Sequence, residues 1–339
     1  MGLNQSVELT YKGEMLNNQK HGQGKEYLNE RIVYEGEFHM GRRTTGTKYY
    51  NIGQKYVGEF KNQVPHGEGV VYRDDGSICY KGSVLNEKKH GQGAGYYPDG
   101  NIVYNGNWYN DMKQGTGKSY YRSGNLAYEG EFTQDLYHGR GKKYHLDGKT
   151  LAYEGGFVNG LYNGAGVEYH PNGQIKSKGI FNRGELHGHA VKYDCKGNIT
   201  SVGTHKYGKL YGQGYYIDKK GCKYEGYFET SKLQGLGKWY YRNGQLAYEG
   251  NYKNNLFHGY GKLYNWDGTL KSKGMFIKGK LHDGALYRKI NSTLYVSVFL
   301  HGKLHEEKTE PVEYEEGADE GDNIELAFGH AEEGVQVLV

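Results

Sequence analysis

The chain has 339 residues, with 43 Lys and Arg against 39 Asp and Glu, and it contains 56 Gly and 36 Tyr but only 4 Pro. So many glycines without a Gly-X-Y period exclude a collagen-like chain, and the many aromatic residues argue against simple disorder. No apolar run reaches the roughly 18 residues that a membrane-spanning helix needs. Three cysteines without metal-ligand spacing favour a reducing compartment, so we expect an intracellular protein.

Residues 1–8 are predicted to form an N-terminal arm. Gly2, with Ser6 four residues later, fits the pattern for N-myristoylation and makes Gly2 a candidate lipidation site. The arm lacks the basic and apolar segments of a secretory signal. Because one acyl chain gives only marginal membrane attachment, this modification would need a second contact such as charge attraction to anionic lipid.

Residues 9–284 are predicted to be a tandem repeat. A glycine recurs every 22 to 25 residues, usually in a phrase such as Tyr128-Glu-Gly-Glu-Phe132. A second phrase, His-Gly-x-Gly, follows after eight or nine residues, as in His138-Gly-Arg-Gly141. A period of this kind indicates units that bury their apolar faces against one another, and such arrays more often bind partners than perform chemistry.

Each unit is expected to be a β-hairpin. The first phrase alternates between aromatic or glycine positions and charged positions, which predicts a short strand with one buried face. The His-Gly-x-Gly run predicts the antiparallel partner strand. Asp-Gly or Asn-Gly pairs end the units, and they signal turns because they tolerate positive φ at both central residues. These pairs are Asp75-Gly76, Asp99-Gly100, Asp147-Gly148, Asn172-Gly173, Asn243-Gly244 and Asp267-Gly268. The predicted fold is all-β, a single elongated and twisted antiparallel ribbon of tandem hairpins.

The aromatic residues and glycines of the first phrase are assigned a packing role. Tyr and Phe rings supply the apolar surface that the low aliphatic content does not. The glycine between them leaves a slot in which a ring can lie. Residues predicted to pack in this way include Tyr34, Gly36, Phe38, Tyr128, Gly130, Phe132, Tyr224, Gly226 and Phe228.

The C-terminal part departs from the repeat. Residues 285–304 are the most aliphatic stretch and are predicted to be a divergent repeat that caps the array. Residues 305–339 hold twelve Asp and Glu against the single Lys308, and we expect them to form a flexible acidic tail. Residues 1–304 keep 42 Lys and Arg against 27 Asp and Glu. This basic array favours acidic partners, unless its lysines only solvate an exposed sheet face.

No residue is predicted to be catalytic, cofactor-binding or metal-ligating. Thr116-Gly-Lys-Ser119 resembles the end of a phosphate-binding loop, but position 112 is Met where that motif needs Gly. The histidines of successive units should lie roughly 10 Å apart if each unit adds two strands. Ligands of one metal sit near 2 Å from it, so these histidines are assigned to hydrogen bonds in the turns.

The two phrases, recurring in phase, resemble the MORN repeat (membrane occupation and recognition nexus) over about residues 9–304. Most units have 24 residues, one more than the commonest unit, as in a variant subclass. The resemblance implies a non-enzymatic scaffold that docks protein partners in a cytoskeletal, ciliary or membrane-associated assembly. Two alternatives stay open: a peripheral membrane protein that binds anionic phospholipids, and an antitoxin-like protein that binds a partner enzyme.

The expected partners and location follow from this resemblance. We expect unidentified protein partners, with anionic membrane lipid as a second candidate and a homodimer as a further arrangement. Nucleic acid and cofactors are not expected. The expected location is the cytoplasm or cytoskeleton, including the cilium, or the periphery of a membrane.

Overall fold

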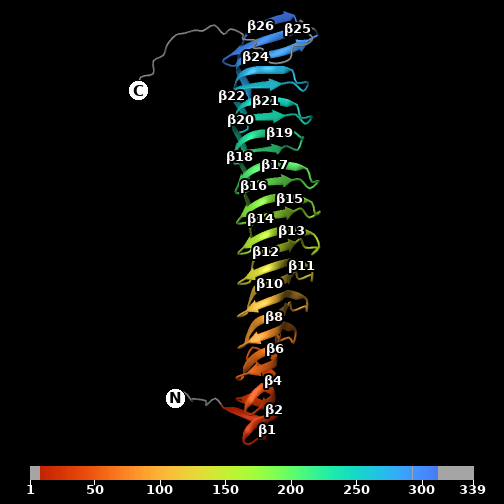
Figure 1. The fold of residues 1–339 in the computed structure, drawn as a ribbon, viewed down its shortest axis with the longest axis vertical. Coiled ribbons are helices and arrows are strands. Elements are labelled where there is room, and N and C mark those ends of the chain that lie inside the picture. Colours follow the sequence, from red (N-terminus) through yellow and green to blue (C-terminus); the bar gives the residue numbers. More distant parts are fainter. Residues whose placement is uncertain (1–7, 292, 312–339) are drawn as a thin grey trace, which may run out of the picture.

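The structure is a computed structural model that describes residues 8–291 and 293–311 (Figure 1). Those residues form one antiparallel sheet of 26 strands, and no helix occurs among them. The strands are β1 (Leu9–Leu16), β2 (Gln19–Leu28), β3 (Arg31–His39), β4 (Arg42–Tyr49), β5 (Lys55–Lys61), β6 (Val64–Tyr72), β7 (Ile78–Leu85), β8 (Lys88–Tyr96), β9 (Ile102–Tyr109), β10 (Met112–Tyr120), β11 (Leu126–Thr133), β12 (Leu136–Tyr144), β13 (Leu151–Val158), β14 (Leu161–Tyr169), β15 (Ile175–Asn182), β16 (Glu185–Tyr193), β17 (Ile199–Lys206), β18 (Lys209–Ile217), β19 (Lys223–Glu229), β20 (Lys232–Tyr240), β21 (Leu246–Lys253), β22 (Leu256–Tyr264), β23 (Leu270–Ile277), β24 (Lys280–Ile290), β25 (Thr293–Leu300) and β26 (Lys303–Pro311).

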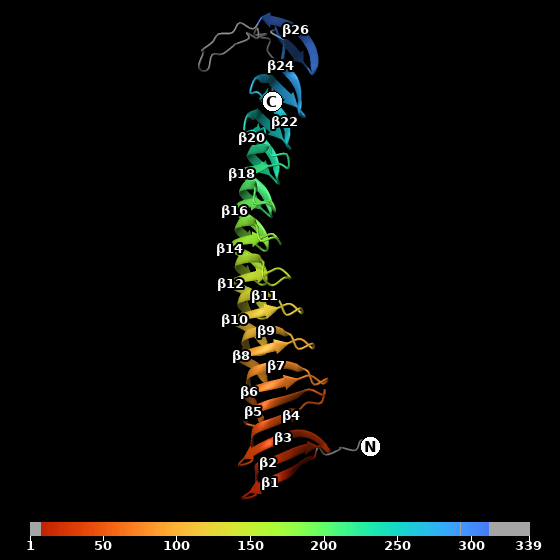
Figure 2. The same ribbon diagram turned by 90° about the vertical axis from the view of Figure 1, so that its right-hand side faces the viewer.

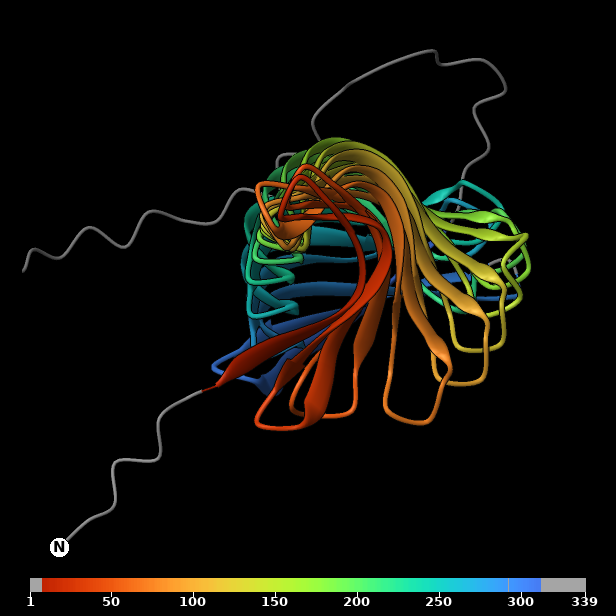
Figure 3. The same cartoon turned by 90° about the horizontal axis from the view of Figure 1, so that it is seen from below.

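Each strand pairs with the next strand in the chain, so the sheet is an open meander. The strands stack along one long axis, with β1 and β26 at opposite ends (Figures 1 and 2). Viewed along that axis, the sheet is arched and its turns fan out progressively, because the twist of successive strands accumulates (Figure 3). The predicted all-β, elongated and twisted antiparallel ribbon is confirmed. Within the part that the structure describes, no helix is long and apolar enough to span a membrane.

A ladder of glycines runs along the middle of the sheet. The glycine of the first phrase pairs across strands with the second glycine of His-Gly-x-Gly, as Gly130 does with Gly141. Gly141 in turn pairs with Gly155 of the next unit. The same position is occupied by one residue per strand from Gly13 on β1 to Gly284 on β24, and Ala190 is its single non-glycine member.

The ladder lies beside a bulge at which each hairpin bends. The register of β11 against β12 shifts between Gly130 and Glu131, opposite Gly139, which has a φ of 58°. The side chain of Tyr128 folds back over the ladder, and its hydroxyl donates a hydrogen bond to the Glu131 carbonyl oxygen at 2.9 Å. Equivalent tyrosines make the same bond three residues ahead, so the ring both fills the slot at the glycines and satisfies a carbonyl at the bulge.

Rings from successive units form the core on one face of the sheet, which we call the inner face. Tyr128 is fully buried and packs edge-on against Phe132 and Phe157, with ring centroids 5.1 Å apart in both pairs. A third ring, Tyr137, stacks flat on Tyr128 with centroids 3.9 Å apart. Edge-on and offset aromatic pairs of this kind stabilise beyond the area that they bury. Phe157 also contacts Tyr153 of its own unit, which follows the unit of Tyr128, so the rings couple neighbouring hairpins.

The residue that covers each tyrosine ring changes along the chain. This cover position precedes the His-Gly-x-Gly histidine and lies across from the Phe position, as Tyr137 does from Phe132. In the N-terminal units the cover residue is mostly a cation, such as Lys113, whose Nζ lies 5.4 Å from the Tyr104 ring centroid. Burial lowers the pKa of Lys113. In chain order the cover residues are Lys20, Arg43, Pro65, Lys89, Lys113, Tyr137, Tyr162, Leu186, Leu210, Leu233, Phe257 and Leu281.

The aromatic core is interrupted between two apolar clusters. One cluster runs from Tyr34 to Ala190, and the other begins at Leu210. Between them, polar residues occupy buried positions of the first phrase: Ser201 stands where other units have Tyr, and His205 stands where they have Phe. The His205 ring is 1 % exposed, its Nδ1 lies 3.0 Å from the Gly203 carbonyl oxygen, and its Nε2 is buried without a hydrogen-bonding partner among the described residues.

This interruption predicts a pH-dependent weak point. Burial lowers the pKa of His205, and the nearby Lys192 and His189 lower it further, so the folded state keeps the ring neutral. Below about pH 6.5 the unfolded chain binds a proton that the folded chain does not, and stability therefore falls as pH decreases. In the wild type, this proton costs up to about 1.4 kcal/mol of the free energy of unfolding per pH unit below that value, and we expect His205→Phe to remove the cost.

Urea unfolding of both proteins at pH 7.5 and 5.5 measures the free energy of unfolding. If it falls between the two pH values as much in the variant as in the wild type, the prediction is contradicted.

Two kinds of turn connect the strands. The short turns use residues with positive φ at both central positions, such as Asn110 (48°) and Asp111 (70°). At the predicted Asp-Gly and Asn-Gly turns, only the glycine has positive φ, as at Gly76 (83°). There the Gly76 N–H donates to the Arg73 carbonyl and the Asp75 carboxylate accepts from the Ser77 N–H. The positions of these turns are as predicted, but their type differs, because Asp caps the turn through its side chain instead of adopting a left-handed backbone.

The sheet extends beyond residue 305, at which the sequence predicts the start of a flexible tail. Strand β26 pairs with β25 from Lys303 to Pro311. The Glu307 carboxylate forms an ion pair with Arg288 and accepts a hydrogen bond from the Ser297 hydroxyl at 3.1 Å. The charged composition that suggested a tail is compatible with this strand because its described side chains are exposed at the end of the sheet. Residues 1–7, including Gly2, and 312–339 lie outside the described residues.

Candidate binding surface

The face opposite the rings, which we call the outer face, carries an alternating row of charges beside the glycine ladder. Strand pairing places Lys118 across from Glu129, Glu129 across from Lys142, and Lys142 across from Glu154. Nζ of Lys118 lies 3.1 Å from Oε2 of Glu129, and Nζ of Lys142 lies 3.5 Å from Oε1 of Glu154. Cross-strand pairs of opposite charge stabilise the sheet modestly and fix the side chains relative to one another.

A tyrosine hydroxyl holds the central glutamate of this row in place. The Tyr144 hydroxyl donates to Oε1 of Glu129 at 2.7 Å, leaving Oε2 for Lys118. The Tyr144 hydrogen bond, together with Lys118, holds the pKa of Glu129 below its usual range. Burial and the Glu129 carboxylate raise the pKa of Tyr144 to about 12. Glu129 therefore stays ionised, and Tyr144 stays a donor, through the physiological pH range.

The same arrangement recurs toward both ends of the sheet. Near the N-terminus, Lys25 lies 3.0 Å from Glu35, which also accepts a 2.5 Å hydrogen bond from the Tyr49 hydroxyl. Near the C-terminus, the Tyr264 hydroxyl donates to Glu249 at 2.9 Å. Lysine and glutamate alternate in these stretches, but Lys12 lies across from Lys25 and Lys262 lies across from Lys273. The row is therefore not uniformly basic, and its alternation does not extend over its whole length.

A shallow groove lies on the glycine ladder between β8 and β14. Its volume is about 950 Å³. Glycines form its floor, the alternating charges Lys118, Glu129, Lys142 and Glu154 line one side, and polar residues line the other. The polar residues include Gln92, Thr116 and Asn163, and the cation Arg140 lies among them. The core rings do not line it, since they occupy the inner face. A second groove of about 530 Å³ lies over the equivalent glycines of β18 to β22.

The glycine ladder and the groove lie back to back on the sheet. A Cβ on Gly141 would point to the inner face and lie 2.3 Å from Oη of Tyr128, so the glycines make room for the rings on that side. On the outer face the residues before and after each ladder glycine stand on either side of the backbone, because side-chain direction alternates along a strand. A groove with fixed charges of both signs and many polar groups suits an extended polypeptide that presents complementary charges. The arrangement offers positioning and recognition along a length of surface.

The predicted packing residues occupy the inner face, with one departure. Tyr34, Phe38, Tyr128, Phe132 and Phe228 are buried there. The glycines Gly36, Gly130 and Gly226 belong to the ladder. Tyr224 is only half-buried, and it stacks flat on Tyr216 at 4.7 Å instead of packing edge-on in the core. The core position beneath it is filled by Leu233, which is 1 % exposed.

The histidines of His-Gly-x-Gly pack more than they hydrogen-bond. Nδ1 of His21, His66, His90 and His138 is buried without a hydrogen-bonding partner among the residues that the structure describes. The His90 ring instead lies against Tyr109 of the next hairpin, with centroids 5.1 Å apart. The predicted turn hydrogen bond is therefore wrong for these Nδ1 atoms, and in His21 and His90 the ring instead contacts an aromatic ring of the next hairpin.

The alternating charge row was not predicted from the sequence. Its signal was present: a lysine follows the ladder glycine in Gly141-Lys142 of a His-Gly-x-Gly phrase and in Gly117-Lys118, where Gln114 replaces the histidine, and a glutamate precedes the ladder glycine in Glu129-Gly130. The two signals combine only when the two glycines are placed directly across from each other. That register is set by strand pairing in the folded protein, and neither phrase specifies it alone.

The fold and surface define an all-β repeat rod with an extended outer face. Comparison with protein families matches the MORN repeat at residues 11–29, 34–44, 56–78, 80–102, 128–150, 153–175, 178–199 and 248–269, and the MORN repeat variant at residues 113–134 and 233–254. Together these matches cover more than half of the chain, and the protein belongs to the MORN-repeat family. MORN repeats are interaction and membrane-binding modules, and proteins built from them are generally non-enzymatic scaffolds. Comparison with curated proteins finds no match.

Proposed function

We propose that this protein is a non-enzymatic scaffold that docks extended segments of partner proteins in the outer-face grooves. The observation that carries the proposal is the groove over β8 to β14, with its glycine floor and its alternating Lys and Glu side chains. A partner segment whose charges alternate in the opposite order would place an acidic residue at each lysine and a basic residue at each glutamate. Such charge complementarity fixes the alignment of the bound segment more than it raises the affinity. Repetition of the groove would let one rod hold several segments in a fixed order.

The charge pattern favours protein partners over an anionic membrane. Attraction to anionic lipid grows with the number of unneutralised cations near the surface. On this row Lys118 and Lys142 each face a glutamate, and in the N-terminal half cover residues such as Lys113 lie against core rings. Both features reduce the net positive field that a membrane would meet. We propose the cytoplasm or cytoskeleton, including the cilium, as the location.

Charge reversal at the groove tests the proposal. We expect Lys118→Glu with Lys142→Glu to abolish capture of partner proteins from native extract, because four like charges would then stand side by side in the groove. The matched control is Lys219→Glu with Lys220→Glu, which makes the same charge change in the exposed turn between β18 and β19. Quantitative mass spectrometry of the captured proteins compares both variants with the wild type.

The outcomes separate protein from lipid binding. Loss of a defined set of proteins in the groove variant, with retention in the control, supports docking in the groove. Equal loss in both variants would show that overall charge matters and the groove does not. Flotation with anionic vesicles at low and high salt is the parallel measurement, since charge attraction weakens as salt rises. Flotation without partner capture would replace the scaffold function with a membrane function.

A further inference from the structure

The repeat pattern is broken on β24 in a way that creates a new side-chain cluster. Where other units have His-Gly-x-Gly, this strand has His282-Asp-Gly284, one residue shorter and without the positive-φ glycine after the histidine. Gly284 keeps the ladder position across from Gly274. The shortening therefore places a carboxylate directly beside the histidine.

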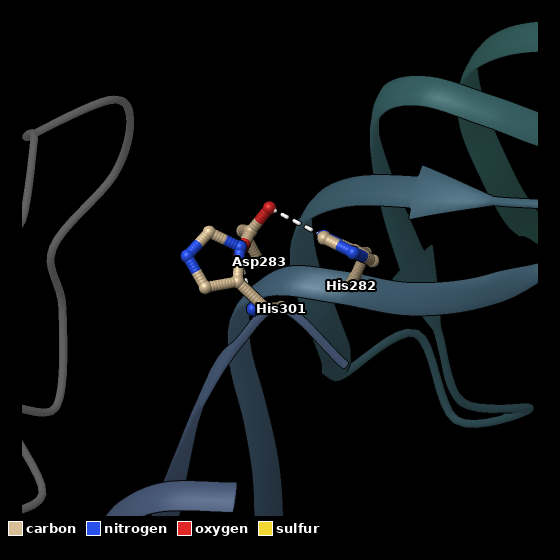
Figure 4. A group of neighbouring side chains, drawn as sticks. All are labelled: His282, Asp283 and His301. Carbon is tan, nitrogen blue, oxygen red and sulfur yellow. Dashed lines mark hydrogen bonds and ion pairs between the residues drawn. The ribbon is translucent and has the colours of Figure 1, made fainter. Parts of the chain in front are cut away.

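The next hairpin supplies a second histidine to this cluster. His301 lies in the turn between β25 and β26, and its ring packs against His282 with centroids 5.8 Å apart. Nδ1 of His282 lies 2.6 Å from Oδ2 of Asp283, and Nδ1 of His301 lies 3.8 Å from Oδ1 of the same carboxylate. Figure 4 shows the two imidazoles on either side of the Asp283 carboxylate. The three candidate ligand atoms all lie within 4.8 Å of one another.

Backbone hydrogen bonds hold the two hairpins in this arrangement. The His301 N–H donates to Oδ1 of Asp283 at 2.6 Å, and the Gly302 N–H donates to the His282 carbonyl oxygen at 2.8 Å. These bonds fix the carboxylate and the turn that carries His301. The His282 and Asp283 side chains are partly exposed and the His301 side chain is 87 % exposed, so the cluster is open to solvent.

We propose that His282, Asp283 and His301 form a binding site for a divalent transition-metal ion, with Zn²⁺ as the ion that fits best. Two imidazoles and one carboxylate are a common zinc ligand set, with water in the open fourth position. Metal–ligand bonds near 2 Å in a tetrahedron separate ligand atoms by roughly 3.3 Å. Here Nδ1 of His282 lies 2.6 Å from Oδ2 of Asp283, Nδ1 of His301 lies 3.8 Å from Oδ1, and the candidate ligand atoms all lie within 4.8 Å of one another. Side-chain rotations would bring one atom from each residue to the spacing that the metal needs.

An internal comparison shows what is special about this cluster. In the first unit His21 also packs against a histidine of the next hairpin, His39, with centroids 5.3 Å apart. The residue corresponding to Asp283 is Gln23, which supplies no carboxylate. The roughly 10 Å spacing of equivalent histidines excludes a metal shared between successive units at that position. A turn histidine such as His301 escapes this limit, because the packing of a hairpin turn on a neighbouring strand is not visible in the sequence.

Calorimetric titration of the full chain with ZnCl₂ tests the site. We expect one ion to bind per chain at this site, with affinity reduced at least about tenfold in Asp283→Asn and in His301→Gln. The matched control, His21→Gln with His39→Gln, should bind as the wild type does. His301→Gln changes an exposed turn residue and is expected to fold normally, so it remains informative if a change at Asp283 disturbs β24.

Cobalt substitution identifies the ligand atoms independently. We expect the Co²⁺ complex to show weak visible bands of nitrogen and oxygen ligation, which both variants would lose. An intense near-ultraviolet thiolate band would assign the ion to Cys79, Cys195 or Cys222 and overturn the proposal. Unchanged zinc affinity in both the Asp283→Asn and His301→Gln variants would overturn it as well. Neither result depends on the partner binding proposed for the grooves.

Discussion

Replacing Gly141 with Ala is expected to destabilise the central hairpins by about 3 kcal/mol, the upper end of the range for overpacking a rigid core. A Cβ on Gly141 would lie 2.5 Å from Cε2 of Tyr128 and closer still to Cζ and Oη. Tyr128 is fully buried between Phe132 and Phe157 and cannot move aside. Gly141 does not have positive φ, so the effect arises from the contact and not from backbone strain.

One unit of the chain already carries an alanine in place of the ladder glycine, together with a smaller residue in place of the tyrosine. At the equivalent positions of β15 and β16, Ser177 replaces the tyrosine and Ala190 replaces the ladder glycine, and both residues are buried. We therefore expect Gly141→Ala to be nearly neutral in a Tyr128→Ser background, although Tyr128→Ser alone is itself destabilising. The resulting coupling free energy between the two sites should be about 3 kcal/mol.

Urea unfolding of the wild type, both single variants and the double variant measures this coupling. Hydrogen exchange of the β11 to β13 amides localises the effect, because repeat arrays can open region by region. If the changes in free energy of unfolding of the two single variants add in the double variant, contact with the tyrosine ring is not the reason for the glycine ladder. The same result would contradict the idea that Ala190 is tolerated because Ser177 replaces a tyrosine.

Replacing Phe157 with Ala is expected to cost about 3 to 5 kcal/mol and to uncouple the two sides of the rod. Phe157 is 2 % exposed and packs edge-on against Tyr128 and Tyr153, which belong to successive units. Stability in a repeat array is approximately a sum of unit and nearest-neighbour terms. Loss of one interface should therefore split the unfolding of the chain into two separate transitions.

Ile180→Ala provides the matched control for this variant. Ile180 precedes the buried Phe181 but points to the outer face, where it is 46 % exposed. We expect it to change stability by no more than about 0.5 kcal/mol. Thermal and urea unfolding of both variants, followed by near-ultraviolet circular dichroism of the tyrosines, compares them. A single unshifted transition in Phe157→Ala would mean that strand pairing, rather than ring packing, couples the units.

The strands and the inner face could be predicted from local pattern, whereas the cross-strand relations could not. Alternation in Tyr128-Glu-Gly-Glu-Phe132 specifies a strand and its buried side, because side-chain direction has a period of two. The pairing of Gly130 with Gly141 depends on the bulge at Gly139, which shifts the register by an amount that no local rule fixes. The alternating charges and the grooves depend on that register, so they were missed with it.

Departures from the repeat can be seen in the sequence, but their consequences need the structure. Ser177 and Ser201 stand where other units have tyrosine, yet nothing local indicates that His205 is buried in a Phe position. The cluster of His282, Asp283 and His301 combines a shortened phrase on one strand with the turn of the next hairpin. Its members are 19 residues apart at most, but only the packing of the last hairpins brings their ligand atoms together.

The polar interruption around Ser201 and His205 has a mechanical consequence for a rod of this length. Edge-on contacts between core rings run up to Phe181 and resume with Tyr216 and Phe228. Between them the buried positions are held by smaller or polar side chains, among them Ala190, Ser201 and His205. Because these side chains make fewer ring contacts, we expect this segment to bend more easily than the aromatic parts of the rod on either side of it. Partners bound on the two sides of this segment would then change their orientation relative to each other, while the distances between partners bound on the same side stay constant.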